Sequence, residues 1–248
     1  MDKNLNAYVS YLCNDKFLEG VIALKKSLKR VGTQFDLYCM VTEEVTEDCR
    51  NKLNENEILL IDIEKIQVRR SEGIKDRYKE NSWMMFTKLN LWKLIQFQSI
   101  IYLDADVIVL KNIDQVFSLS RECNFAAVKD MGYDGISAGV MFLKPSINTF
   151  NDMMQNIESN EYDNTFSDQS FTNWYFTIKN KSWKQLPDIL NVLEKRIPFE
   201  QNYNQIAIFH YNGQKPWVTD PQDICKWQKG ENLAYVFWHY IRRYDEKL

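Results

Sequence analysis

The sequence predicts an α/β fold in which a mostly parallel, Rossmann-like central sheet is flanked by helices, and three observations indicate this class. The 248-residue chain is 45% hydrophobic and 26% charged, which is ordinary for a soluble globular protein. Short apolar runs alternate with helical patterns through the first half. One such run ends at two aspartates, Asp104 and Asp106, and open α/β sheets carry their sites at strand ends. Because we find no linker or repeat, we expect one domain over residues 1–248.

The first half reads as strands that alternate with helices. Its predicted strands are residues 7–13, 35–41, 57–63 and 99–103, and its predicted helices are residues 17–32, 46–53 and 82–97. In the first helix, apolar residues recur at steps of three and four from Phe17 to Val31, and Gly32 is a suitable stop. This order predicts parallel strands joined by helical crossovers.

The second half is less regular. It predicts strands at residues 125–130, 139–146 and 206–209, a helix at 147–159 that begins after Pro145, and a last helix at 231–244. The strand at 206–209 enters the loop HYNGQKPW, which is rich in turn residues. The last helix mixes aromatic and basic residues, and we expect it to pack against the sheet.

Charge and cysteine content exclude several classes of protein. The net charge is −3 and no basic block is long enough to follow a phosphate backbone, so we expect no nucleic-acid partner. The five cysteines lack zinc spacing, which favours a reducing compartment. No segment is typical of a signal peptide or a membrane span. We therefore expect a soluble, cytoplasmic protein without an integral membrane segment.

The two aspartates suit a divalent cation. Carboxylates are rarely buried without a partner, and two of them at one strand end can converge on Mg²⁺, Ca²⁺ or Mn²⁺. An imidazole ligand would favour Mn²⁺. Of the two histidines, His210 follows a predicted strand, whereas His239 lies in the last helix, so His210 is the better third ligand. Each of these features alone is common in proteins without a metal.

Taken together and in order, these motifs resemble glycosyltransferase family 8, the glycogenin-like sugar transferases. The resemblance covers nearly the whole chain, through VSYLCND, TKLNLW, YLDADVIVLKNID, SAGVMFLKPS, SDQ and HYNGQKPW. It implies a GT-A fold and a retaining transferase that moves a hexose, glucose as the best guess, from a UDP-sugar. Residues 1–110 would form the nucleotide-binding half, and residues 111–248 the half for the sugar and acceptor.

The resemblance also assigns residues to the donor. Asp104, Asp106 and His210 would bind Mn²⁺, with Mg²⁺ as the alternative, and Asp104 would also contact the ribose. The remaining donor-binding residues that it implies are Tyr11, Cys13, Asn14, Phe17, Arg77, Lys88, Ala105, Gly213 and Lys215. Lys215 and the Gly213 backbone would face the diphosphate. For Phe17, stacking on the base and core packing are equally good interpretations.

The sugar end departs from the family pattern in detail. Ser137 and Ala138 match the donor-sugar stretch, although Ser137 stands where the family usually has asparagine. Asp168 and Gln169 match the pair beside the reacting carbon, where a carboxylate could stabilise a cationic transition state or act as a nucleophile. The HYNGQKPW loop is one residue shorter than usual, and Cys13 replaces a threonine. Arg77 has an offset spacing to Lys88.

Two other functions stay open at this point. The run IIYLDADVIVL also resembles the nucleophile motif of haloacid-dehalogenase-like phosphatases, although those enzymes usually carry it on their first strand. A nucleotide-sugar-binding protein that has lost transfer is the non-enzymatic alternative. The acceptor is a glycan, a protein or a lipid, and the resemblance makes a homodimer an expectation.

Overall fold

The computed structural model describes residues 5–69, 82–130, 135–194, 203–219 and 229–243. The strands are β1 (Asn6–Leu12), β2 (Leu37–Val41), β3 (Leu59–Asp62), β4 (Ser99–Leu103), β5 (Val107–Val109), β6 (Phe125–Lys129), β7 (Ile136–Leu143), β8 (Lys184–Leu186), β9 (Val192–Leu193) and β10 (Ile208–His210). They form a seven-stranded sheet in the order β3-β2-β1-β4-β7-β6-β8 and a three-stranded sheet in the order β5-β10-β9.

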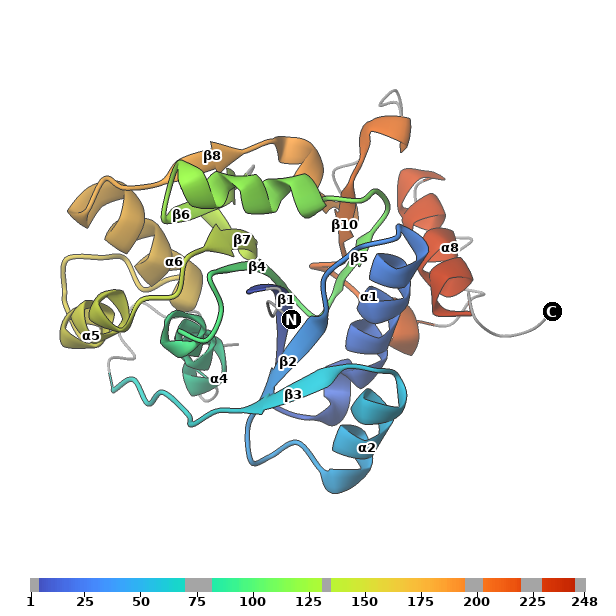
Figure 1. Ribbon diagram of the computed structural model, residues 1–248, viewed down its shortest axis with the longest axis horizontal. Helices are drawn as coiled ribbons and strands as arrows, with labels where there is room; N and C mark the ends of the chain where they lie inside the picture. The colour runs from blue at the N-terminus through green and yellow to red at the C-terminus, as the bar shows by residue number, and fades with distance from the viewer. Residues whose placement is uncertain (1–4, 70–81, 131–134, 195–202, 220–228, 244–248) are drawn as a thin grey trace.

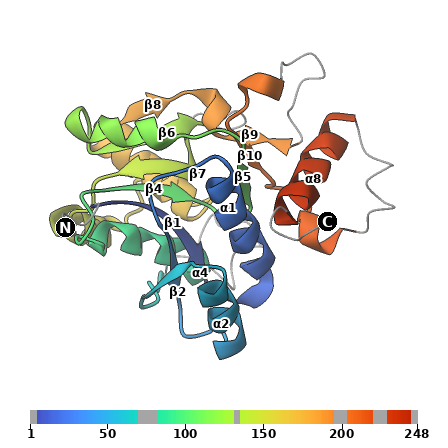
Figure 2. The same ribbon diagram turned by 45° about the vertical axis from the view of Figure 1, so that its right-hand side comes forward.

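Helices of several kinds surround the two sheets (Figures 1 and 2). The α-helices are α1 (Leu18–Arg30), α2 (Glu47–Glu55), α4 (Ser82–Phe86), α5 (Ile147–Asn156), α6 (Asp168–Asn173) and α8 (Lys229–Arg242). The short 3₁₀ turns are η1 (Asp15–Phe17), η2 (Thr87–Lys93), η3 (Asp114–Arg121), η5 (Asp188–Leu190), η7 (Tyr203–Gln205) and η8 (Pro216–Val218), and η4 (Trp174–Lys179) is a π-helix.

The large sheet has the mostly parallel character that the sequence predicts. Strand β1 is parallel to β2 and β4, and β2 is parallel to β3. Strand β7 is antiparallel to both β4 and β6. The six residues between β6 and β7 cannot form a helical crossover, which needs a dozen or more, so this pair turns back on itself. The α/β class is confirmed, with an antiparallel pair in the second half.

Both faces of the large sheet are covered. Tyr8 and Leu12 of β1 pack with α1 and α2 on one face, and Val9 and Tyr11 pack with α4, α5 and α6 on the other. Side chains alternate between the faces along a strand, so a strand buried on both sides reads as a continuous apolar run. This explains the apolar segments of the sequence.

Helix α8 packs on α1 and the small sheet. Its Tyr235, Trp238 and Ile241 are buried in one cluster with Ala23 of α1 and Phe209 of β10. Figures 1 and 2 both place α8 beside α1. Among the described residues, no helix combines the length and the apolar character needed to cross a bilayer.

The helix expected at residues 82–97 differs from the sequence prediction. The α-helix stops at Phe86, and the 3₁₀ turn η2 continues to Lys93. A 3₁₀ turn aligns residues three apart, so Leu89 and Trp92 enter the core together. The first helix ends as expected, because Gly32 has φ +70°, a conformation that glycine adopts without strain.

Candidate active site

The turn Asp104-Ala105-Asp106 joins the two sheets. It follows β4 of the large sheet and precedes β5 of the small one. Strand β10 is antiparallel to β5 with His210 opposite Val107, and the Tyr211 amide donates to the Asp106 carbonyl at 2.9 Å. This register brings His210 beside the turn although about a hundred residues separate them in sequence.

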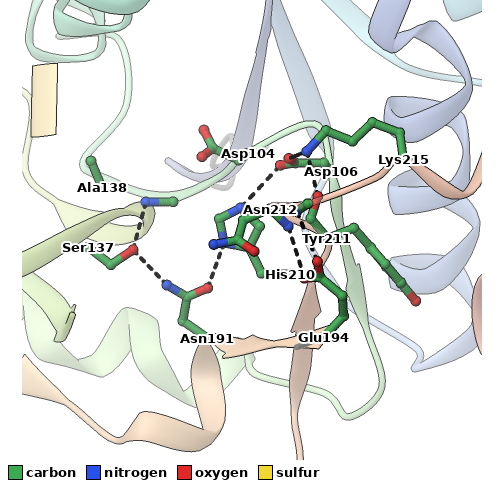
Figure 3. Close-up of polar contacts among 12 residues, drawn as sticks. Asp104, Asp106, Ser137, Ala138, Asn191, Glu194, His210, Tyr211, Asn212 and Lys215 are labelled. Atoms are coloured by element: carbon green, nitrogen blue, oxygen red, sulfur yellow. Dashed lines mark hydrogen bonds and ion pairs between the residues drawn. The ribbon is translucent and has the colours of Figure 1, made fainter. Parts of the chain in front are cut away.

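The two aspartates and the histidine converge on one point (Figure 3). One ligand atom of each of Asp104, Asp106 and His210 lies within 4.8 Å of the other two. Two carboxylates and an imidazole form a donor set that suits Mn²⁺. The same set can bind Mg²⁺, although Mg²⁺ has a weaker preference for the imidazole nitrogen. The predicted metal ligands therefore share a site large enough for one ion.

Gly139 makes room for this cluster. A Cβ atom at position 139 would lie 2.4 Å from Cε1 of His210 and 3.2 Å from Oδ2 of Asp104. Strand β7 holds the position, because the Asp104 amide donates to the Gly139 carbonyl at 2.9 Å. The space beside the two ligands exists because residue 139 has no side chain, and the donor set fits a small cation there.

Asp106 is balanced by two basic side chains. The Lys215 ammonium lies 2.6 Å from Oδ2 of Asp106, and Nε2 of His210 lies 3.3 Å from Oδ1. Burial would raise the pKa of Asp106, but His210 and Lys215 together hold it below its usual value. Burial would lower the pKa of His210, and the Asp106 carboxylate outweighs it and raises that pKa. Asp106 is thus ionised and basic groups surround it.

Lys88 links Asp104 to a third carboxylate. Its ammonium lies 3.0 Å from Asp104 Oδ1 and 3.2 Å from Asp168 Oδ2. Burial would lower the pKa of Lys88, but the two carboxylates raise it above its usual value, so the side chain is charged. Tyr102 donates its hydroxyl to Asp104 at 2.5 Å. Lys88 and Tyr102 therefore hold Asp104 in a fixed orientation at the candidate metal site.

Asp168 is buried at the start of α6. Burial raises its pKa and Lys88 opposes that shift, so Lys88 favours the ionised form. The preceding residue, Ser167, has φ +54°, an unusual conformation that costs about 1–3 kcal/mol outside glycine. Strained backbone of this kind is enriched at functional sites. Here it precedes a carboxylate that lines the cavity.

Gln169 is held from both ends of its amide. Its Oε1 accepts the Ala138 amide at 3.2 Å, and its Nε2 donates to Asp130 Oδ2 at 3.1 Å. One lone pair and one hydrogen of the amide are left for a ligand. The predicted pair Asp168–Gln169 thus faces the same cavity as the metal ligands.

The other end of the cavity lies at the start of α1. Asn14 caps η1 by accepting the Lys16 amide at 3.0 Å, and its Nδ2 lies 3.6 Å from Cys13 Sγ. Phe17 lines the cavity and also meets the Trp217 ring edge-on, with the centroids 5.6 Å apart. Phe17 is thus packed against Trp217 and also reaches the cavity, where stacking on a nucleotide base stays a prediction.

One cavity of about 520 Å³ collects nearly all the residues that the sequence singled out. The predicted residues that line it are Tyr11, Cys13, Asn14, Phe17, Lys88, Asp104, Ala105, Asp106, Ser137, Ala138, Asp168, Gln169, His210 and Lys215. Arg77 lies outside the described residues. Gly213 is not among the lining residues, and its amide donates to Glu194 Oε1 at 2.9 Å.

Several residues of the site were missed by sequence reasoning. Asp130, Met84, Met85 and Phe166 line the cavity, and Asn191 contacts His210 behind it. Asp130 is the last residue of the predicted strand 125–130, and a carboxylate at a strand end is a usable signal for a site residue. Asn191 follows no motif that a single sequence reveals.

Comparisons with known proteins agree on one family. A family model described as glycosyl transferase family 8 matches residues 8–220. Glycogenin-1 of Caenorhabditis elegans is 28% identical over 209 residues, which is 83% of this chain and 45% of that protein. Inositol phosphorylceramide glucuronosyltransferase 1 of Arabidopsis thaliana is 33% identical over 171 residues, 68% of this chain and 30% of that protein. The chain spans less than half the length of both relatives.

Solved structures show the same fold. The galactosyltransferase LgtC, solved in complex with donor and acceptor sugar analogues, superposes with a TM-score of 0.68 at 15% identity, covering 97% of each chain. GlyE of Streptococcus pneumoniae superposes with a TM-score of 0.68 at 20% identity, covering 96% of this chain and 63% of that one. The predicted GT-A architecture is confirmed.

Proposed function

Because the chain belongs to glycosyl transferase family 8, we propose that it transfers a hexose, glucose as the first choice, from a UDP-sugar to an acceptor with retention at the anomeric carbon. The convergence of Asp104, Asp106 and His210 within 4.8 Å carries the proposal. The cavity beside them, about 520 Å³, has a volume typical of small-molecule sites, and Asp168 and Gln169 line it. We further propose one catalytic domain, with residues 1–110 as the nucleotide half and 111–248 as the sugar and acceptor half.

Asp104, Asp106 and His210 would hold a Mn²⁺ ion, with Mg²⁺ as the second candidate. A bound dication supplies positive charge to the diphosphate oxygens as the sugar–phosphate bond breaks. The chain contributes fixed geometry to this site. Tyr102 and Lys88 orient Asp104, and the β5–β10 pairing orients His210 relative to Asp106.

Lys215 would contribute a further positive charge to the leaving diphosphate. Its ammonium pairs with Asp106 at 2.6 Å and with the Tyr211 carbonyl. A cation bound by Asp106 competes with Lys215 for the same carboxylate, so the ammonium becomes available to a phosphate oxygen. The one-residue-shorter loop is compatible with this role, because Lys215 still lines the cavity.

Asp168 and Gln169 would act at the reacting carbon. The Asp168 carboxylate, which Lys88 contacts at 3.2 Å, would stabilise positive charge as the sugar becomes cation-like. The Gln169 amide, held by Ala138 and Asp130, would orient the sugar or the incoming hydroxyl. Binding and orientation by these side chains lower the barrier through positioning as well as charge.

The donor sugar and the acceptor are proposed only as classes. The relatives carry different names, a glycogenin and a glucuronosyltransferase, so family membership alone allows more than one donor. Ser137, in place of the usual asparagine, lies in the cavity wall and is the first position to examine for donor preference. The acceptor is a glycan, a protein or a lipid. We propose that the protein forms a homodimer, as the family resemblance led us to expect. We also propose a reducing, cytoplasmic location, in keeping with the four described cysteines, which are free thiols.

A thermal-shift panel of nucleotide sugars with and without Mn²⁺ tests the proposal. The true donor should raise the melting temperature only with the metal, because a ligand that binds only the folded state stabilises it. Asp106→Asn should lose the response. Slow hydrolysis of UDP-glucose with Mn²⁺ then separates a transferase from a protein that only binds. Release of phosphate from p-nitrophenyl phosphate without UDP-sugar binding would replace the proposal with the phosphatase alternative.

A further inference from the structure

His210 is held from behind by an asparagine that no motif predicts. Nδ1 of His210 lies 2.8 Å from Oδ1 of Asn191, on the side of the ring away from Asp106 (Figure 3). The other end of the Asn191 amide donates from Nδ2 to Ser137 Oγ at 2.8 Å. All three side chains are buried, with exposed fractions of 7% for His210, 5% for Asn191 and 7% for Ser137.

The backbone fixes Asn191 at this place. It lies between η5 and the two-residue strand β9, and β9 is parallel to β10 with His210 opposite Leu193. The Ala207 amide donates to the Ile189 carbonyl at 3.0 Å, which attaches η5 to the segment that leads into β10. Two separate backbone contacts therefore hold the asparagine beside the histidine.

The amide of Asn191 presents its oxygen to the ring and its nitrogen to Ser137. Ser137 Oγ also accepts the Gly139 amide at 3.4 Å, so two N–H donors face this hydroxyl. An oxygen at this position accepts a hydrogen from Nδ1, which leaves the lone pair of a neutral ring on Nε2, the nitrogen that faces Asp106.

We propose that Asn191 is a positioning residue that fixes the ring orientation and tautomer of His210 for metal binding. Metal-binding histidines commonly donate their second N–H to an oxygen acceptor, and loss of that acceptor weakens metal binding about 10–100-fold. Through Ser137, the same amide joins the metal ligand to strand β7, which carries the sugar-facing residues. The inference rests on the proposed function, because it needs a metal at this site.

Metal affinity measured on purified protein tests this role. We expect Asn191→Leu, which keeps the branched shape of the side chain and removes the acceptor, to weaken Mn²⁺ binding about 10–100-fold in a titration followed by electron paramagnetic resonance. Mg²⁺ binding, measured by calorimetry, should change less than about 3-fold, because a hard cation depends mainly on the two carboxylates. Asn191→Asp supplies an oxygen to Nδ1 and should restore Mn²⁺ affinity.

Asn90→Leu is the matched control. Asn90 is also buried, at 2% exposure, and its amide donates to the carbonyls of Glu64 and Thr87 at 2.9 Å each. This variant should lose stability and keep its Mn²⁺ affinity. If Asn191→Leu fails to fold, Ser137→Ala gives the second measurement, since removing the anchor of Asn191 should weaken Mn²⁺ binding about 3–10-fold, less than removing the acceptor itself.

Three results would overturn the inference. The first is an unchanged Mn²⁺ affinity in Asn191→Leu. The second is an equal loss of Mn²⁺ and Mg²⁺ affinity in that variant, and the third is the same loss of Mn²⁺ affinity in Asn90→Leu. The second and third results would indicate a general structural effect. A wild-type protein that binds neither ion overturns the proposed function instead. The two failures are therefore distinguishable in one set of titrations.

Discussion

Replacing Gly139 with alanine should remove the histidine from the metal site without unfolding the protein. The new Cβ would lie 2.4 Å from Cε1 and 2.8 Å from Nδ1 of His210, whereas ordinary contact begins at 3.4 Å. The ring must therefore retreat by about 1 Å. Metal–ligand distances tolerate only about 0.2 Å, so a shift of this size ends ligation by the imidazole. The two aspartates would remain, and we expect Mn²⁺ affinity to fall by at least about 10–100-fold.

The assay is Mn²⁺ titration by electron paramagnetic resonance, together with the melting temperature of the metal-free protein. Gly32→Ala is the matched control, because Gly32 has φ +70° and nothing within 4 Å of an added Cβ. That variant should lose about 1 kcal/mol from backbone strain and keep its metal affinity. If Gly139→Ala binds Mn²⁺ as tightly as the wild type, then His210 is not a ligand, and the reasoning fails.

Three further predictions follow from the charges and the histidines. Lys215→Met should bind Mn²⁺ alone at least as tightly as the wild type, because a competitor for Asp106 is removed. The same variant should bind UDP in the presence of Mn²⁺ about 10–100-fold more weakly. Calorimetry gives both dissociation constants, and weaker binding of Mn²⁺ as well as UDP would contradict the phosphate-binding role of Lys215. Lys88→Met should cost about 3–5 kcal/mol in urea unfolding, because the buried Asp168 and the partly buried Asp104 lose their partner, and a cost below about 1 kcal/mol would contradict this ion-pair assignment. Burial, and to a lesser extent Arg243, lower the pKa of His239 in the folded protein. Just below pH 6.5 this histidine therefore binds more protons in the unfolded chain than in the folded one. Its contribution to the free energy of unfolding should thus fall as the pH drops below 6.5. His239→Gln should flatten this part of the pH–stability curve, and an unchanged slope would refute the assignment.

The strand ends that carry the site were predictable because their signals are local. An apolar run that stops at two carboxylates, and a second run that stops at His210, both indicate strand ends at one edge of an α/β fold. The residue types then restrict the ion. What brings the two ends together is the register of β5 with β10, in which His210 lies opposite Val107. Sequence patterns do not encode that register, so the convergence was expected only through the family resemblance.

The supporting contacts were not predictable for a physical reason. Strand β9 is only two residues long, too short for a period-2 pattern, yet it places Asn191 behind His210. Glu194, just after β9, accepts the amides of Asn212 and Gly213 at 3.1 and 2.9 Å. The Gly213 amide is thus bonded to Glu194, and Gly213 is not among the residues that line the cavity. Contacts between irregular segments depend on tertiary packing, which periodicity does not report.

The two lysines of the site have different roles because of where their carboxylates lie. Lys88 holds Asp104 and Asp168 together, and neither of these two ion pairs involves Asp106. Lys215 contacts only Asp106 among the three carboxylates. A cation bound by Asp104, Asp106 and His210 therefore competes with Lys215 directly, while Lys88 still has Asp168 as a partner. Under the proposed function, Lys88 would keep the carboxylates in place throughout a catalytic cycle, and Lys215 would be the charge that moves between Asp106 and a phosphate.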